Sequence, residues 1–430
     1  MDKHAQDVQR PTSTSHALKR LYARQQARSE EKPSPNPPAA MLFELGLALA
    51  ALHFAVPLGY YAAAKRWLRR SWDIREDVRY TPRVTVIIPT YNEAENIVRR
   101  LENLLAQDYP RDRLEVIVAD GASTDGTPEI AERWAREHPD VKVAVLREER
   151  RDGKAKSLNR ALRLASGEVV VIADADALWA PDALRRAVAK LADPSVGAVS
   201  CVKKPMEARG IEDGYRGYYN ALRVAESKAW STPIFHGELA AFRRDALEAV
   251  GGFPTDIGAD DSHTATLIAL KGLRAVVADD VLCAEAVPRR GYHAWRVRRA
   301  QHLVQHFARI LPAVPKAPRR FKPILAIETY LHLANPWLFL AAIALLAASA
   351  LAGSLAAAGV LALGAALLAY KPYRTWAVAQ AYLATAAVRN LWTKEEVWRK
   401  QDKSNGHAAD GAMIQISATS DKPALKGAEP

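Results

Sequence analysis

The sequence has few cysteines, the residues that form disulfide cross-links and most structural zinc sites. Only two of its 430 residues are cysteine, Cys201 and Cys283, and both lie in apolar runs typical of buried strands. This count excludes a disulfide framework, and the spacing excludes a structural zinc site. With 49% hydrophobic residues the chain can bury a full core, in two or three structural units. It is therefore not a small cross-linked domain.

Acidic residues are too few to balance the basic ones, and the formal net charge is +12. Such an excess is compatible with a nucleic acid, an anionic membrane face or an anionic substrate as partner. The basic residues cluster beside apolar runs and not in a patch interleaved with aromatic residues. We therefore expect membrane lipids and no nucleic acid among the partners.

Both ends of the chain lack apolar periodicity. Residues 1–40 mix Lys, Arg, Gln and Ser and end in a proline-rich stretch, and residues 400–430 are polar. This composition predicts two disordered tails.

Residues 41–64 are mostly apolar and long enough to cross a hydrocarbon core of roughly 30 Å. The stretch starts too late and runs too long for a cleaved signal peptide. A basic juxtamembrane linker, residues 65–82, follows at once, and the positive-inside rule then puts the next domain in the cytoplasm. We expect an integral membrane protein; the alternative is the solvated basic face of a soluble helix.

Two more apolar segments, residues 330–352 and 354–370, are separated by Gly353 and predict a hairpin of two transmembrane helices. The second is near the lower length limit for a span, so a broken interfacial pair is the alternative. Residues 374–398 are amphipathic and rich in tryptophan, which is typical of a segment lying in the membrane interface.

Residues 83–310 alternate between short apolar runs and amphipathic stretches. Strands are predicted at residues 84–88, 114–119, 141–146 and 169–173, and helices between them. This alternation predicts an α/β fold, with a mostly parallel sheet covered by helices on both faces.

Asp174 and Asp176 stand at the end of the run 169–173, five apolar residues of which four are β-branched, as is typical of a buried strand. Ligands bind at the carboxyl ends of parallel strands, and carboxylate oxygens suit Mg²⁺ or Mn²⁺ carrying a diphosphate. The alternative is an ordinary polar strand end.

Five ordered motifs carry a resemblance to a known family. They are VTVIIPTYNE at 84–93, VADGASTDGT at 118–127, GKAKSLN at 153–159, DAD at 174–176 and the acid pair at 260–261. Together they resemble a family 2 glycosyltransferase with the GT-A fold, a Rossmann-like domain. The arrangement of the apolar segments is similar to that of membrane-bound members such as cellulose and hyaluronan synthases and polyprenyl-phosphate sugar transferases.

The resemblance implies a nucleoside-diphosphate sugar as donor. The residues that it implies for donor binding are Pro89, Thr90, Tyr91, Glu93, Asp120, Lys154, Lys156 and Asp174. By the same resemblance, Asp176 coordinates the divalent cation. The family usually has a second acid after Asp120, whereas this chain has Gly121.

On the acceptor side the resemblance implies Gly237, Glu238, Asp260 and His263, with Asp261 as the catalytic base. The role of Glu238 stays open because most members have another residue there. A neighbouring acid raises the pKa of a carboxyl group and makes it a better base. Two acids at a helix start are also common as caps, and an acceptor that is already an anionic phosphate needs little base catalysis.

Processive members carry a Gln-x-x-Arg-Trp motif whose tryptophan stacks on the acceptor sugar, and this chain lacks it. The nearest match contains Arg298 and Arg299, which are candidates for binding either the diphosphate or anionic lipid. The loss favours single sugar transfer over polymer synthesis.

The sequence thus predicts a metal-dependent, inverting, membrane-bound glycosyltransferase of polysaccharide or glycolipid biosynthesis, with a lipid-linked or glycan acceptor. Two alternatives stay open, a processive polysaccharide synthase and a catalytically silent nucleotide-sugar-binding subunit.

Overall fold

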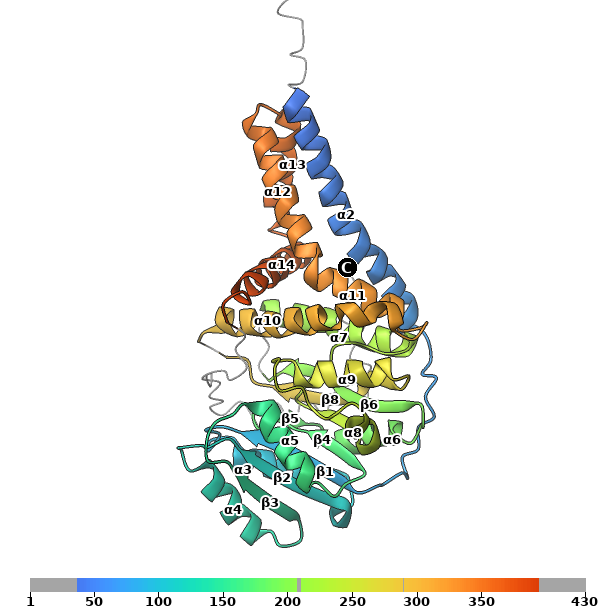
Figure 1. Ribbon diagram of the computed structural model, residues 1–430, viewed down its shortest axis with the longest axis vertical. Helices are drawn as coiled ribbons and strands as arrows, with labels where there is room; N and C mark the ends of the chain where they lie inside the picture. The colour runs from blue at the N-terminus through green and yellow to red at the C-terminus, as the bar shows by residue number, and fades with distance from the viewer. Residues whose placement is uncertain (1–36, 207–209, 289, 394–430) are drawn as a thin grey trace, which may run out of the picture. The chain divides into compact units, whose positions relative to one another are not determined.

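The computed structural model describes residues 37–206, 210–288 and 290–393 (Figure 1). The described chain divides into two units. The smaller unit contains the described part of Met1–Leu49 and Ala341–Ala365, and the larger contains Ala50–Leu340 and the described part of Ala366–Pro430. The predicted tails lie outside the described residues apart from residues 37–40.

The structure contains helices in every region where the sequence predicts them. In chain order they are α2 (Pro37–Leu68), α3 (Ile97–Leu105), α4 (Thr127–Glu137), α5 (Lys154–Leu164), α6 (Ala183–Lys190), α7 (Gly210–Ala229), α8 (Arg244–Ala249), α9 (Asp260–Leu270), α10 (Tyr292–Ile310), α11 (Lys322–Leu333), α12 (Asn335–Leu351), α13 (Leu355–Leu367) and α14 (Lys371–Arg389), with 3₁₀ turns η1 (Arg111–Arg113) and η2 (Leu311–Lys316). The last five residues of the predicted interfacial segment lie outside the described range.

The smaller unit is built from the beginning of α2, the end of α12 and most of α13. Gly46 allows α2 and α12 to pack closely, because a Cβ atom there would lie 3.0 Å from the Cγ of Leu346. The hydroxyl of Ser349 donates a hydrogen bond of 2.7 Å to the carbonyl of Ala39. These contacts join two apolar helices through a small residue and one satisfied polar group.

Of the helices that the structure describes, only α2 is by itself long and apolar enough to cross a membrane. α11 and α12 reach that length only as one broken pair, bent by 44°, and α13 with α14 forms a second broken pair. By length and composition the described chain therefore offers one to three spans.

The larger unit contains an eight-stranded sheet in the order β3-β2-β1-β4-β7-β6-β8-β5. The strands are β1 (Val84–Thr90), β2 (Leu114–Asp120), β3 (Lys142–Arg147), β4 (Val169–Ile172), β5 (Ala177–Trp179), β6 (Val196–Pro205), β7 (Ala240–Arg243) and β8 (Arg274–Glu285). Strands β1 to β4 pair in parallel, with Val84 opposite both Leu114 and Val169. The α/β fold class is confirmed.

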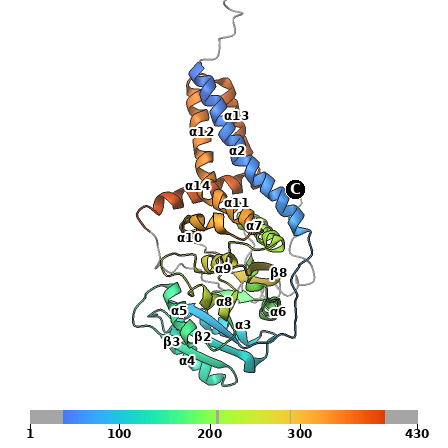
Figure 2. The ribbon, with the colours of Figure 1, turned by 45° about the vertical axis from the view of Figure 1, so that its right-hand side comes forward.

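The sheet is mixed, because β7 runs antiparallel to β4 and β6, and β5 runs antiparallel to β8. Every residue of β2 and of β4 is buried, so both faces of these strands are covered, as their continuous apolar runs predict. Figure 2 shows helices on both sides of the strands in the larger unit. The strands β1, β2 and β4 bring their carboxyl ends, and the acids that follow them, to one edge.

Candidate active site

A cavity of about 320 Å³ opens at the carboxyl ends of β1 and β4 in the larger unit. One part of its wall comes from the turns after β1 and β4 and from the first turn of α5, and another from the start of α9 and from α7, α10 and α14. Most of the residues predicted for the site line it, namely Pro89, Thr90, Tyr91, Glu93, Lys154, Asp174, Asp176, Gly237, Glu238, Asp260, Asp261, Arg298 and Arg299.

Three of the predicted site residues do not line this cavity. Asp120, at the end of β2, is buried, and its carboxylate accepts hydrogen bonds from the Thr90 hydroxyl at 3.0 Å and the Ser123 amide at 2.9 Å. Lys156 lines a separate hollow of about 20 Å³. His263 is buried, and its Nδ1 lies 3.2 Å from Nδ1 of His306.

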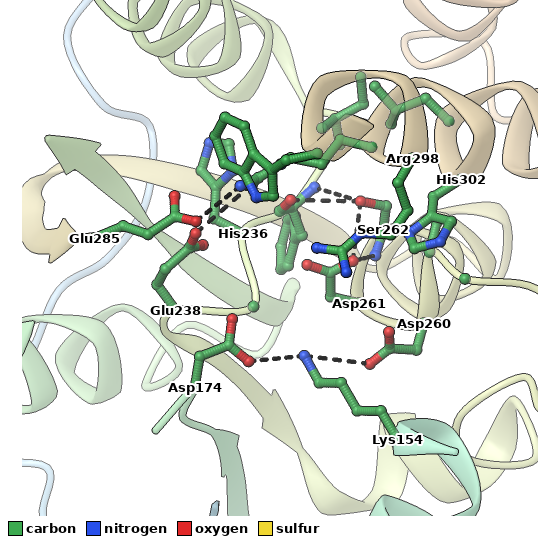
Figure 3. A pocket seen from close by; sticks show the side chains of 18 of the residues that line it. Lys154, Asp174, His236, Glu238, Asp260, Asp261, Ser262, Glu285, Arg298 and His302 are labelled. Carbon is green, nitrogen blue, oxygen red and sulfur yellow. Dashed lines mark hydrogen bonds and ion pairs between the residues drawn. The ribbon is translucent and has the colours of Figure 1, made fainter. Parts of the chain in front are cut away.

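Lys154 joins the acids of the two sides of the cavity, as Figure 3 shows. Its Nζ lies 2.8 Å from Asp174 Oδ1 and 3.9 Å from Asp260 Oδ2. Burial lowers the pKa of Lys154, but Asp174, Asp260 and Asp261 raise it, and the net shift is upward. Lys154 therefore stays protonated, pairs with Asp174 and lies close to the acids at the start of α9.

Gly237 lies where these groups converge. A Cβ atom at this position would be 3.0 Å from Lys154 Nζ, 3.3 Å from Asp261 Oδ2 and 3.4 Å from Asp174 Oδ2. The indole Nε1 of Trp179 on β5 donates a hydrogen bond of 2.6 Å to the carbonyl of the next residue, Glu238, and fixes the backbone there. Only glycine leaves the space between the charged groups open.

Asp261 is half-buried at the second position of α9. Its Oδ1 accepts hydrogen bonds from the Ser262 amide at 2.6 Å and the Ser262 hydroxyl at 3.2 Å. Removal from bulk water and the charge of Asp260 raise the pKa of Asp261 to about 7. A carboxyl group with this pKa is suited to accept a proton near neutral pH.

Glu238 is part of a buried ion cluster beside the acids. Lys203 Nζ lies 2.9 Å from Glu238 and 3.4 Å from Glu285, and Arg299 lies 2.8 Å from Glu285. Arg216 approaches Glu285 at 3.1 Å. Burial, opposed by the charge of Lys203, raises the pKa of Glu238. The ion pairs of this cluster connect β6, β8, α7 and α10 at the cavity wall.

Sequence reasoning did not find Lys203, Arg216 or Glu285. Lys203 and Glu285 lie at the carboxyl ends of apolar strand runs, as Asp174 does, so the same signal was present. Their partners, however, come from strands and helices that are distant in sequence.

Aromatic side chains contribute to both parts of the cavity wall. The guanidinium of Arg151 lies 3.6 Å from the ring centroid of Tyr91. On α10, Arg296 lies 3.6 Å from the ring centroid of Tyr215 and 5.7 Å from that of Tyr382. Tyr382 belongs to α14, which no sequence motif connects with the site.

The carboxylates fit a divalent cation that is bound together with a substrate. Among the described residues, no group of three or more His, Cys, Asp or Glu side chains could hold a metal ion alone. Mg²⁺ and Mn²⁺ are commonly held by one or two carboxylates and completed by substrate phosphates and water. Asp176 at the cavity wall carries a carboxylate of this kind.

Two family models match the chain. Glycosyl transferase family 2 matches residues 85–251, and glycosyl transferase family group 2 matches residues 169–388.

Among curated relatives, the β-monoglucosyldiacylglycerol synthase of Synechocystis sp. is 32% identical over 187 residues, 42% of this chain and 39% of that protein. Glycosyltransferase AglE of Haloferax volcanii is 30% identical over 211 residues, 48% of this chain and 68% of that protein. Cellulose synthase 2 of Novacetimonas hansenii is 29% identical over 56% of this chain but only 15% of its own. The chain thus spans well under half the length of two of these three.

A solved structure gives a longer match. The mannosyltransferase PcManGT from Pyrobaculum calidifontis, in complex with GDP-Man and Mn²⁺, is 63% identical. The match has a TM-score of 0.77 and covers 82% of this chain and all of that one.

Proposed function

The chain belongs to glycosyl transferase family 2, and on that premise we propose that it is a membrane-anchored, metal-dependent enzyme that transfers a hexose with inversion. The donor is a nucleoside-diphosphate sugar, with GDP-mannose as the first candidate, and the acceptor is a lipid-linked or glycan molecule. One observation carries the proposal. Asp174 and Asp176 share one cavity with Asp260 and Asp261, in a chain that is 63% identical to a mannosyltransferase bound to GDP-Man and Mn²⁺.

The donor lies, in this proposal, at the edge formed by β1, β2 and β4. Tyr91 and the turn after β1 contact the nucleotide, and Asp174 orients it. Asp120 does not contact the donor itself. Its carboxylate accepts hydrogen bonds from the Thr90 hydroxyl and the Ser123 amide and so positions the two turns beside the nucleotide. Asp176 holds the divalent cation, which, when bound, neutralises the charge that develops on the departing diphosphate.

The acceptor enters from the side of α7, α10 and α14. Asp261 accepts the proton of the attacking hydroxyl group, and Lys154 balances the charge of the acids around it. Attack from the face opposite the diphosphate inverts the anomeric carbon. Arg298 and Arg299 line the same cavity, and Arg299 is held by Glu285 at 2.8 Å.

The membrane anchor is α2, supported by the two broken helix pairs. The basic residues directly after the apolar run favour a cytoplasmic catalytic domain. The one to three candidate spans among residues 37–393 favour single transfer over a processive synthase, which needs a translocation pore.

A donor panel on membranes that contain the full chain tests the proposal. UDP- and GDP-sugars are supplied with Mn²⁺ or Mg²⁺, and release of nucleoside diphosphate and incorporation of sugar into lipid extract are followed. We expect metal-dependent transfer that Asp176→Asn and Asp261→Asn lower at least a hundredfold, on the order of a lost catalytic proton acceptor. Asp112→Asn, which changes an exposed carboxylate of η1, is the matched control.

Each outcome of the panel separates the alternatives. A product of many sugars indicates a processive synthase. Donor binding without turnover under any acceptor condition favours a silent nucleotide-sugar-binding subunit. Turnover that survives Asp261→Asn contradicts the assignment of Asp261 as the catalytic base.

A further inference from the structure

Two short basic segments, distant in sequence, lie outside the cavity. One directly follows the apolar run of α2, and the other joins η2 to α11. All of their basic residues are exposed, and we call them the basic collar: Lys65, Arg66, Arg69, Arg70, Lys316, Arg319, Arg320 and Lys322.

The end of α7 brings the two segments to one region of the larger unit. Lys228 Nζ donates a hydrogen bond of 3.3 Å to the carbonyl of Leu68, within the first segment. Two residues further on, the ring of Trp230 lies 5.6 Å from that of Phe321, within the second segment. In Figure 1 the end of α2 and the beginning of α11 lie side by side at the right. The fold thus joins two charge clusters that the sequence keeps about 250 residues apart.

Neighbouring carboxylates do not neutralise the collar. Asp73 is paired with Arg274, and Asp279 is paired with Lys228 at 3.3 Å and accepts a hydrogen bond from the Trp72 indole at 3.0 Å. In the described ranges none of the eight collar residues has a carboxylate oxygen within 4.0 Å. The collar therefore presents its positive charge to whatever lies outside the protein.

The position of the collar next to the apolar run of α2 indicates what its positive charge binds. Its first four members follow the apolar run of α2 without a break, and Lys65 lies 4.8 Å from the ring centroid of Tyr61. Aromatic and basic residues together at the end of an apolar helix are typical of the headgroup layer of a bilayer. Clusters of four to eight lysines and arginines beside a membrane helix bind anionic lipids.

We propose that the basic collar binds the anionic headgroups of the leaflet from which α2 emerges. The proposal rests on the membrane anchoring in the proposed function but not on the glycosyl transfer. Because no collar residue lines the cavity, headgroup binding and sugar transfer are separable in the experiment.

The test uses the full chain in lipid nanodiscs made of equal amounts of phosphatidylcholine and phosphatidylglycerol. Lipids that stay bound on extraction are counted by native mass spectrometry. The collar variant carries Lys65→Gln, Arg66→Gln, Arg319→Gln and Arg320→Gln. The control variant removes the same charge from exposed sites elsewhere, through Arg133→Gln, Arg136→Gln, Arg163→Gln and Lys271→Gln.

We expect the wild-type protein and the control to retain phosphatidylglycerol in excess. The collar variant loses that excess more than tenfold, since each cation near an anionic surface contributes about fivefold. In the wild-type protein the excess also falls as salt rises from about 0.05 M to about 0.5 M, because salt screens exposed charges.

Three results overturn the proposal: an excess that the collar variant retains, an equal loss in the control variant, or an excess that salt does not change. The salt dependence is measured on the wild-type protein, so it tests the proposal even if the collar variant does not fold. Turnover with the donor is measured in all three proteins, so that failure of the proposed function is recorded independently of lipid binding.

Discussion

At the scale of single residues, the charge state of Asp261 determines when the proposed reaction can run. Its pKa of about 7 lies above the usual value of a carboxyl group, because it is removed from bulk water and lies beside Asp260. Below that pKa the group is protonated and cannot accept the acceptor's proton; above it the group is ionised and can.

We therefore expect kcat/KM to rise about tenfold per pH unit below about pH 7 and to level off above it. Initial rates with saturating metal, from about pH 5 to about pH 9, measure this profile. Asp260→Asn removes the neighbouring negative charge and shifts the rise to lower pH. A profile that keeps its rise in Asp261→Asn assigns the titration to another group.

Individual residues also show which parts of the site the sequence could reveal. Asp174 and Asp176 were placed at a strand end because they follow the apolar run 169–173, whereas Asp261 was identified only by the resemblance of its acid pair to a family motif. Asp120 was placed at the correct strand end, but its burial under Thr90 and Ser123 depends on how the turn folds. Tyr382 could not be found, because only the packing of α14 against α10 brings it to the cavity.

At the scale of secondary-structure elements, Glu285 connects parts that are far apart in the chain. It is the last residue of β8, and it pairs with Lys203 on β6, Arg216 on α7 and Arg299 on α10. Because Glu285, Lys203 and Arg216 are nearly fully buried, water cannot replace the Glu285 carboxylate as a partner for these two cations.

We expect Glu285→Ala to lower the free energy of unfolding by about 3–5 kcal/mol, since it removes a buried carboxylate that pairs with three cations. Chemical denaturation followed by tryptophan fluorescence measures the change. Asp112→Ala, which breaks an exposed pair with Arg113, should cost under about 1 kcal/mol. Equal effects of the two substitutions would mean that the cluster does not hold these elements together.

Element boundaries were predictable within one residue where an apolar run ends in charge, as for β2 and β4, whereas β1 runs two residues past the predicted 84–88 and includes Pro89. The antiparallel insertion of β7 between β4 and β6 was not, because a strand of four residues carries no signal of its direction. Likewise, the sequence predicted one span at residues 330–352, whereas α11 and α12 are separate helices with a bend between them.

At the scale of the whole molecule, the proposed cytoplasmic position of the larger unit is open to a direct test. Both native cysteines, Cys201 and Cys283, are buried, so an added surface cysteine is the main reactive thiol of the folded chain. Lys271→Cys, at an exposed site of the larger unit, provides that thiol.

We expect a membrane-impermeant maleimide to leave Lys271→Cys unlabelled in intact cells and to label it after the membrane is opened. The wild-type chain stays unlabelled in both conditions and serves as the control. Labelling in intact cells would place the larger unit outside and reverse the orientation that the basic linker predicts.

The path of the chain through the sheet also sets an order of events during synthesis. The segment with Asp174 and Asp176 joins β4 to β5, and these strands pair with β7 and β8, which are made much later. Strand β4 lacks its partner β7 until the chain has been released through Arg243, and β5 lacks its partner β8 until the chain has been released through Glu285. In the proposed function, the nascent chain therefore inserts α2 into the membrane before its donor site is complete, so that anchoring precedes competence for sugar transfer.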